Sequence, residues 1–228
     1  MKYEAVIFDL FGTLIDSFTI KEHERVMLEM ADVLSAPAED FVRLWVQYYD
    51  QRAVGAFATS QACIEHICRT LGLQPDDWQI ERAAQARLDL TQRALVPRTD
   101  AIDTISTLRA LDYRIGLISD CSSEVPVLWG HTPFAPLIDA PIFSCSSGLK
   151  KPDPRIYWLA CERLRVDPGR CIYVGDGGSR ELTGAAEVGM RPVLIRIPDI
   201  DKRDPHVVDA DEWQGTTISS LKDILTLL

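Results

Sequence analysis

The sequence predicts an α/β protein with a three-layer, Rossmann-like parallel sheet and an inserted, entirely α-helical domain. Two observations lead to this fold class. Five short apolar runs alternate with helical patterns along most of the chain, which is typical of a parallel sheet covered by helices on both faces. One long stretch, residues 17–95, interrupts this alternation with helical spacing alone. We therefore expect a core domain formed by residues 1–16 and 96–228, and a helical domain formed by residues 17–95.

Each predicted strand is a short run rich in Val, Ile, Leu or aromatic side chains. Nearly continuous apolar runs of this kind are typical of strands that are buried on both faces. The five runs are YEAVIFD (3–9), YRIGLIS (113–119), PIFSCS (141–146), CIYVGD (171–176) and PVLIRI (192–197). The helices expected between the later strands are residues 100–111, 153–165 and 180–188.

The remaining segments are predicted as helices and loops. Apolar residues at helical spacing mark four segments of the insert, residues 26–34, 41–52, 63–72 and 78–95. The Pro-rich residues 126–141 predict a short helix followed by irregular chain, and residues 198–213 predict an acidic loop. Residues 218–228 predict a closing amphipathic helix that begins at a serine cap.

The amino-acid composition disfavours some classes of binding partner. The 228 residues carry a formal net charge of −10, which disfavours nucleic acid and anionic membranes because both bind clustered Lys and Arg. No apolar run approaches the length of a membrane-spanning helix, and the start of the chain lacks the features of a signal peptide. The six cysteines show no C-x-x-C pair. We expect a cytoplasmic monomer or homodimer that binds a small, anionic molecule.

Polar residues gather where the predicted strands end. Ligands of open α/β sheets bind beyond the carboxyl ends of the strands. The polar residues that follow the first four strands are Asp9 and Thr13, Ser119 and Asp120, Lys150 and Lys151, and Asp176 and Glu181. Each of them alone is more typical of a turn or a helix cap. Their joint occurrence at consecutive strand ends favours a functional site.

This set of residue types suits phosphoryl transfer. A carboxylate can attack phosphorus and form an aspartyl-phosphate. The attack brings two anions together, which is unfavourable unless cations neutralise them. A lysine can supply one positive charge, and Mg²⁺ held by oxygen ligands can supply the rest. Thr13, Ser119 and the amides of the glycine turn could donate hydrogen bonds to phosphate oxygens.

Four motifs in this order resemble the haloacid dehalogenase (HAD) superfamily. They are IFDLFGTL (7–14), IGLIS (115–119), KPDPRIY (151–157) and YVGDGGSRELTGA (173–185). The resemblance runs from residue 3 to about residue 197. It implies the Rossmann-like HAD fold, and it implies that the helical insert is a C1-type cap, a lid over the active site.

The resemblance also implies a role for each motif residue. Asp9 would be the nucleophile, and Thr13 would orient it or bind substrate. Ser119 would bind a phosphate oxygen, with Asp120 beside it in the substrate-binding group. Lys151 would be the catalytic lysine, with Lys150 its exposed neighbour. The ligands of Mg²⁺ would be Asp9, the backbone carbonyl of Phe11, Asp176 and, through a water, Glu181.

Phe11 departs from the phosphatase pattern. Phosphatases of the superfamily usually carry an aspartate there, which protonates the leaving group, whereas haloacid dehalogenases often carry an aromatic residue. Halide leaves without a proton, so Phe11 favours dehalogenation. Dehalogenases, however, tend to have neutral side chains in the fourth motif. Here Asp176 and Glu181 would form a three-carboxylate cluster with Asp9, which raises pKa values and costs stability unless a cation binds.

We therefore expect an Mg²⁺-dependent phosphatase that acts on a small phosphorylated metabolite through an aspartyl-phosphate on Asp9. One alternative is a metal-independent 2-haloacid dehalogenase that uses Asp9 as an ester-forming nucleophile. A catalytically weak ligand-binding protein with the same fold is another. Two groups of residues in the insert bear on the choice. Candidate proton donors are Glu22, His23 and Glu24, and candidates for a halide cradle are Arg43, Trp45, Tyr48 and Arg52.

Overall fold

A six-stranded parallel sheet forms the centre of the computed structural model, which describes residues 2–196 and 213–228. The strands are β1 (Ala5–Phe8), β2 (Arg114–Ser119), β3 (Ala140–Phe143), β4 (Cys171–Gly175), β5 (Arg191–Ile195) and β6 (Thr217–Ile218). Their order across the sheet is β3-β2-β1-β4-β5-β6, and every neighbouring pair is parallel. The predicted α/β fold class is confirmed.

All five predicted strands are present, with two differences. Strand β3 ends at Phe143 because a short helix, α8 (Ser144–Ser147), replaces the rest of the predicted run. The hydroxyl of Ser144 accepts a hydrogen bond from the backbone amide of Cys121, which ties this helix to the loop after β2. Strand β6 was not predicted, since its two residues are too short for a periodicity signal. The predicted acidic loop, residues 198–213, lies outside the described residues except for Trp213.

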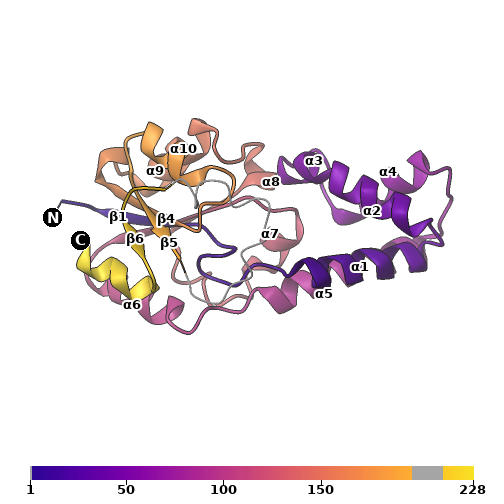
Figure 1. The fold of residues 1–228 in the computed structure, drawn as a ribbon, viewed down its shortest axis with the longest axis horizontal. Helices are drawn as coiled ribbons and strands as arrows, with labels where there is room; N and C mark the ends of the chain where they lie inside the picture. The colour runs from indigo at the N-terminus through magenta and orange to yellow at the C-terminus, as the bar shows by residue number, and fades with distance from the viewer. Residues whose placement is uncertain (1, 197–212) are drawn as a thin grey trace.

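Helices cover both faces of the sheet (Figure 1). One apolar cluster lies on each face of the sheet, and neighbouring residues of a strand point to opposite faces. Phe8 and Val174 therefore belong to one cluster, and Ile7 and Tyr173 to the other. The first cluster includes residues of α6 (Ala101–Ala110), α7 (Glu124–Trp129) and the 3₁₀ helix η2 (Leu221–Thr226). The second includes residues of α9 (Pro154–Leu164) and α10 (Glu181–Glu187), and η1 (Pro168–Arg170) precedes β4.

The closing helix at the carboxyl end differs in type from the prediction. It is a 3₁₀ helix over Leu221–Thr226 rather than an α-helix, although a serine does cap it. The side chains of Ser220 and Asp223 form a reciprocal capping box, and the hydroxyl of Ser220 also donates to Asp100. These contacts anchor the end of the chain against α6.

The inserted segment contains five helices that extend to one side of the sheet (Figure 1). They are α1 (Ile20–Val33), α2 (Ala38–Gln47), α3 (Tyr49–Ala53), α4 (Ser60–Thr70) and α5 (Asp77–Ala94). They share an apolar cluster of their own, with Phe41, Trp45 and Ile64 among its buried members. A separate core supports our proposal that residues 17–95 form a domain. Among the described helices, none is long and apolar enough to cross a lipid bilayer.

Candidate active site

The turn after β1 places the first acidic residue of the site. The backbone amide of Asp9 donates to the carbonyl of Val174, so the chain is still tied to β4 where the strand ends. Gly12 follows with a φ of +80°, and a Cβ there would lie 2.0 Å from Oδ2 of Asp176. Only glycine allows this approach. The turn therefore brings Asp9 and Asp176, 167 residues apart in sequence (176 − 9), into one site.

A buried lysine joins two of the carboxylates. The ammonium nitrogen of Lys151 lies 2.5 Å from Oδ1 of Asp9 and 2.6 Å from Oε2 of Glu181. The exposed fractions of the three side chains are only 4%, 7% and 0%, in that order. Charged groups removed from water in this way persist only when they are paired and hydrogen-bonded. Lys151 supplies that pairing for both acids.

The site nevertheless lacks positive charge. Ligand atoms of Asp9, Asp176 and Glu181 all lie within 4.8 Å of one another. Burial raises the pKa of Asp9 to about 7, and the charge of Glu181 adds to this although Lys151 opposes it. Burial likewise raises the pKa of Glu181 to about 7, with a contribution from Asp176 and against the effect of Lys151. One ammonium group does not offset three neighbouring carboxylates.

Glu181 is held on both of its carboxylate oxygens. Besides Lys151, the hydroxyl of Tyr173 donates to Oε2 at 2.8 Å, and the backbone amide of Gly177 donates to Oε1 at 3.0 Å. The hydroxyl of Tyr157 donates to the backbone carbonyl of Glu181. Tyr173 was not predicted as a site residue. The sequence signal for it is a tyrosine inside an otherwise apolar buried strand, where a hydroxyl needs a hydrogen-bond partner.

Three buried polar atoms at the site have no hydrogen-bond partner among residues 2–196 and 213–228. They are Oδ2 of Asp9, Oγ1 of Thr13 and Oγ of Ser119. Buried polar atoms in folded proteins are nearly always hydrogen-bonded, so an unpaired group is informative. The three residues come from the ends of the neighbouring strands β1 and β2. Their shared lack of partners indicates a place for a polar ligand.

The other two predicted strand-end residues have different surroundings. Oδ1 of Asp120 accepts a hydrogen bond from the backbone amide of Lys151 at 3.0 Å, so it anchors the loop that carries the lysine. The side chain of Lys150 instead pairs with Asp50 of α3 and lies over the ring of Tyr49. Lys150 thus contacts the inserted helices, and Lys151 enters the site.

The ring of Phe11 packs at one end of a row of aromatic rings. Its ring centre lies 5.2 Å from that of Phe18, which stacks on His23 at 4.8 Å. Arg87 lies over Phe18, and its Nη1 is 2.9 Å from Nε2 of His23. Burial, followed by the charge of Arg87, lowers the pKa of His23 to about 4. The imidazole is therefore neutral near pH 7, with Nε2 accepting from Arg87, and this contact leaves it unsuited to donate a proton to a leaving group.

The other candidates in the insert also have structural contacts. The carboxylate of Glu22 accepts hydrogen bonds from the amide and hydroxyl of Thr19, in the capping box that begins α1. Of the residues considered for a halide cradle, Arg43 is exposed and pairs with Asp40. The guanidinium of Arg52 lies over the ring of Trp45 at 4.0 Å, and both side chains are buried.

A buried polar contact joins the inserted helices to the sheet domain. Glu124, at the start of α7, accepts a hydrogen bond from Ser60 at 2.6 Å and lies 3.4 Å from Nε of Arg87. All three side chains are largely buried. The contact forms between residues far apart in the chain, so the sequence pattern gave no sign of it.

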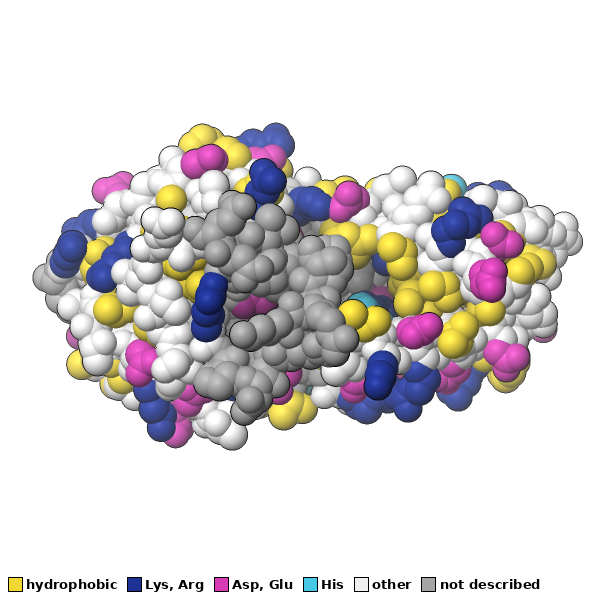
Figure 2. All heavy atoms as spheres, in the orientation of Figure 1, with side chains coloured by type: hydrophobic (Ala, Val, Ile, Leu, Met, Phe, Trp, Pro, Cys, Tyr) yellow, Lys and Arg dark blue, Asp and Glu magenta, His cyan; other side chains and the backbone are white. Residues whose placement is uncertain are grey.

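Figure 2 shows apolar side chains gathered on the half of the molecule that the inserted helices form.

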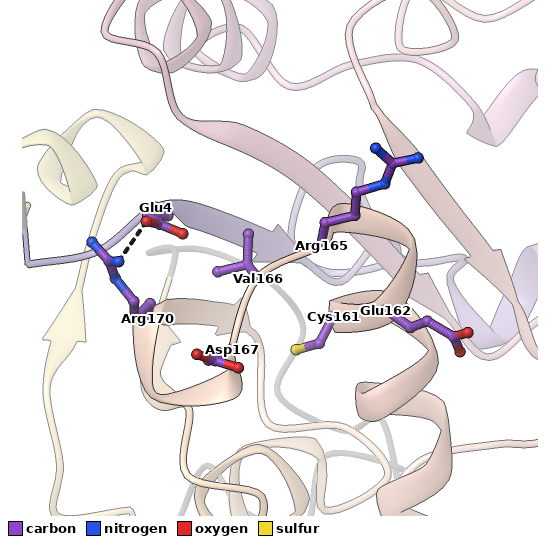
Figure 3. Close-up of a pocket in the computed structure, with 7 residues that line it drawn as sticks. All are labelled: Glu4, Cys161, Glu162, Arg165, Val166, Asp167 and Arg170. Carbon is purple, nitrogen blue, oxygen red and sulfur yellow. Dashed lines mark ion pairs between the residues drawn. The ribbon is translucent and has the colours of Figure 1, made fainter.

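A surface pocket of about 310 Å³ lies away from these residues (Figure 3). Its lining comes from the chain just before β1, the end of α9 and the segment leading into β4, namely Glu4, Cys161, Glu162, Arg165, Val166, Asp167 and Arg170. These segments meet at the amino ends of the parallel strands, whereas Asp9, Ser119 and Asp176 follow the carboxyl ends. The pocket is therefore separate from the candidate active site.

Comparison with known proteins gives the site a context. A family model described as haloacid dehalogenase-like hydrolase matches residues 3–189. (S)-2-haloacid dehalogenase 4A of Burkholderia cepacia is 28% identical over 199 residues, which cover 84% of this chain and 82% of that protein. Glyceraldehyde 3-phosphate phosphatase of Methanopyrus kandleri is 26% identical over 198 residues, which cover 85% of this chain and 84% of that protein.

Solved structures show the same fold with both activities in their names. A 2-haloacid dehalogenase from Pseudomonas syringae pv. Tomato superposes with a TM-score of 0.74 at 21% identity, covering 99% of this chain and 97% of that one. A HAD phosphatase from Thermococcus onnurineus superposes with a TM-score of 0.65 at 20% identity, covering 98% of this chain and 97% of that one. At these identities the superpositions establish the fold and leave the reaction open.

Proposed function

The chain belongs to the haloacid dehalogenase-like hydrolases, and from that premise we propose that it is an Mg²⁺-dependent phosphatase of a small phosphorylated metabolite. The observation that carries the proposal is the carboxylate cluster of Asp9, Asp176 and Glu181, whose ligand atoms lie within 4.8 Å of one another. Burial, and then the neighbouring carboxylates, raise the pKa values of Asp9 and Glu181 although Lys151 opposes the rise. A divalent cation bound among these carboxylates would supply the positive charge that keeps them ionised.

The residues present fit Mg²⁺. Asp9, Asp176 and the backbone carbonyl of Phe11 would hold the ion directly. Both oxygens of Glu181 already accept hydrogen bonds from Lys151, Tyr173 and Gly177, so Glu181 would support the ion through a water, as the resemblance implied. When bound, Mg²⁺ supplies charge neutralisation for the phosphoryl group and keeps the carboxylates ionised.

The nucleophile is already oriented by its contacts. Lys151 holds Oδ1 of Asp9, which leaves Oδ2 as the oxygen without a partner. Oδ2 would attack phosphorus, the bond from phosphorus to the leaving oxygen would break, and an aspartyl-phosphate would form. Water would then hydrolyse this acyl phosphate, releasing phosphate and restoring Asp9. Lys151 would compensate the charge of the phosphoryl oxygens during both steps.

Thr13 and Ser119 would bind the phosphoryl group. Both side chains are fully buried, and their hydroxyls have no hydrogen-bond partner in the described structure. A phosphate oxygen at this place would satisfy both hydroxyls at once. Asp120 would hold the Lys151 loop in position. As the resemblance implied, it would also belong to the substrate-binding group.

Phe11 restricts the leaving group. No carboxyl group stands at position 11, and His23 and Glu22 are engaged elsewhere. General acid catalysis typically contributes about 10²- to 10⁴-fold to a rate. Substrates whose leaving group departs without a proton, such as aryl, acyl or anhydride phosphates, should therefore react faster than alkyl phosphates. The aromatic pair Phe11 and Phe18 would line this side of the site.

A 2-haloacid dehalogenase is the second candidate. Phe11 favours it, because halide needs no proton, and so does the similarity to (S)-2-haloacid dehalogenase 4A. Asp9 would then form an ester with the substrate carbon as halide leaves. The acids Asp176 and Glu181 have no role in that reaction, and Arg52 is stacked on Trp45 inside the helical cluster. These two observations make the phosphatase the better supported proposal.

One pair of assays separates the candidates. Purified protein is given p-nitrophenyl phosphate with and without Mg²⁺ and a chelator, and 2-chloropropionate under the same conditions. The phosphatase proposal requires phosphate release that depends on Mg²⁺ and stops with the chelator. Halide release that is indifferent to the chelator would contradict it and establish the dehalogenase. If phosphate or Mg²⁺ binds without turnover of either compound, the chain is a ligand-binding member of the family.

A further inference from the structure

Two thiols form a pair near the amino ends of the parallel strands, away from the candidate active site. Cys161 lies in the last part of α9, and Cys171 is the first residue of β4. Their sulfur atoms are 3.8 Å apart, and all six cysteines are free. A disulfide needs about 2.05 Å between the sulfurs, so a combined shift of less than 2 Å would join them. Rotation of the two side chains can contribute to this shift.

The pair has a route to solvent. Both side chains are almost fully excluded from the surface, but Cys161 lines the pocket of about 310 Å³, and its sulfur points into that pocket (Figure 3). A reagent the size of water can therefore reach one of the two sulfurs. Cys171 is fully buried, and its sulfur donates to the carbonyl of Asp167 at 3.5 Å.

The contact between the thiols favours reaction at Cys161. The contact with Cys171 lowers the pKa of the Cys161 thiol, against the opposing effects of burial and Asp167, whereas the pKa of Cys171 is raised. The thiolate is the nucleophilic form of cysteine. Position and protonation therefore agree on which sulfur an oxidant meets first.

We propose that Cys161 and Cys171 form a peroxide-sensitive dithiol, in which hydrogen peroxide produces an intrachain disulfide. The sulfur of Cys161 attacks one peroxide oxygen, the O–O bond breaks, and a sulfenic acid and water result. The sulfur of Cys171 then attacks the sulfenic sulfur, the S–O bond breaks, and a second water leaves. Two thiols are oxidised and one peroxide is reduced.

The disulfide would link two elements that carry active-site residues. Helix α9 follows Lys151 and contains Tyr157, and β4 leads to Asp176. The nine residues between the cysteines would become part of a closed loop, which restricts the unfolded chain. The oxidised protein should therefore melt at a higher temperature than the reduced protein.

Peptide mapping tests the proposal on the native full-length chain. Protein is treated with hydrogen peroxide, free thiols are blocked, and trypsin is added. Cleavage after the arginines at 155, 163, 170 and 180 yields peptides 156–163 and 171–180, each with one cysteine. The expected result is a linked species with the mass of both peptides less two hydrogen atoms, which disappears on reduction. It should be lost in both Cys161→Ser and Cys171→Ser.

Controls separate the pair from general oxidation. Cys68→Ser removes another buried cysteine, whose pKa is affected only by burial, and should leave the linked species unchanged. In Cys171→Ser, a sulfenic acid should form on Cys161 and be captured by a dione reagent. The proposal is overturned if native protein yields both peptides unlinked, or if the link forms only in urea. Because the wild-type chain decides these outcomes, a poorly folding variant would not obscure them.

Discussion

The ammonium group of Lys151 bonds one carboxylate oxygen of Asp9 at 2.5 Å and leaves the other oxygen of Asp9 buried without a partner. The pair thus orients a carboxylate and keeps one of its oxygens available. The same ammonium holds Glu181 at 2.6 Å, so its single charge is shared between two acids. Five predictions follow from this charge arrangement and from the groups around it.

Asp9→Asn should abolish hydrolysis while preserving the fold. An amide cannot act as the nucleophile, and loss of a catalytic nucleophile typically costs on the order of 10⁴- to 10⁶-fold in kcat. The measurement is p-nitrophenyl phosphate turnover, with circular dichroism to check folding. Asp40→Asn, at an exposed ion pair on α2, is the matched control and should retain wild-type turnover. Near-wild-type activity in Asp9→Asn would refute the assignment of the nucleophile.

Lys151→Met should destabilise the protein more at pH 8 than at pH 5. The folded-state pKa values of Asp9 and Glu181 are about 7, above their ordinary values of 3.8 and 4.5. The folded chain therefore binds more protons between about pH 4 and pH 7, and its stability falls as pH rises through that range. Without Lys151 both pKa values rise further, so the fall continues above pH 7.

Urea unfolding at the two pH values measures this effect. Breaking a buried ion pair typically costs about 3–5 kcal/mol, and we expect a loss of that order at pH 8. At pH 5 the acids are protonated and the loss should be smaller. Lys150→Met, which changes the more exposed neighbouring lysine, should show little dependence on pH. An equal loss at both pH values for Lys151→Met would contradict the charge balance described for the site.

Mg²⁺ should raise the melting temperature of the wild-type protein. An ion that binds only the folded state stabilises it by about 2.7 kcal/mol at 100 times its dissociation constant, which corresponds to roughly 5–10 °C for a chain of this size. Asp176→Asn should lose most of this shift because it removes a ligand. Asp40→Asn should keep it. A full shift in Asp176→Asn would place the ion elsewhere.

Phe11→Asp should speed the hydrolysis of alkyl phosphates. A carboxyl group at position 11 could protonate the leaving oxygen, which is worth about 10²-fold or more when the donor is well placed. Aryl phosphates, with better leaving groups, should gain less. Phe11→Asn is the control, since it removes the ring contact with Phe18 without adding an acid. If the two variants hydrolyse alkyl phosphates equally, the missing acid does not limit the reaction.

Tyr173→Phe should raise the pKa of Glu181 and shift the acidic limb of the pH–rate profile to higher pH. The variant removes a hydrogen bond that stabilises the charged carboxylate, at a cost in stability of about 1–2 kcal/mol. Tyr157→Phe removes a bond to the backbone carbonyl of the same residue, so it should lower stability without this shift. Identical profiles for both variants would show that Tyr173 does not tune the acid.

Sequence patterns predicted five of the six strands of the described sheet. These strands are nearly continuous apolar runs, because both faces of the sheet are covered, and such runs are visible without any knowledge of contacts. The same patterns failed for β6 and for the type of the closing helix. A two-residue strand has no period, and a 3₁₀ helix of six residues shows the same apolar spacing as an α-helix.

The site was predictable to the level of its motif residues. The carboxyl ends of parallel strands converge, so residues that follow β1, β2 and β4 had to meet. Which lysine of the pair enters the site was inferred by resemblance, and the structure places Lys151 there and Lys150 against Asp50. Tyr173 and the contact between Glu124 and Arg87 were missed, since both depend on side chains meeting across elements.

Local periodicity and strand order were enough to predict the fold class and the acids, hydroxyls and lysines that follow the strands. The protonation and pairing of these groups could be found only in the folded structure. Lys151 lies between Asp9 and Glu181, and burial together with Arg87 keeps His23 neutral. Burial and the distances between segments far apart in the chain set electrostatic energies, and local spacing encodes neither of them.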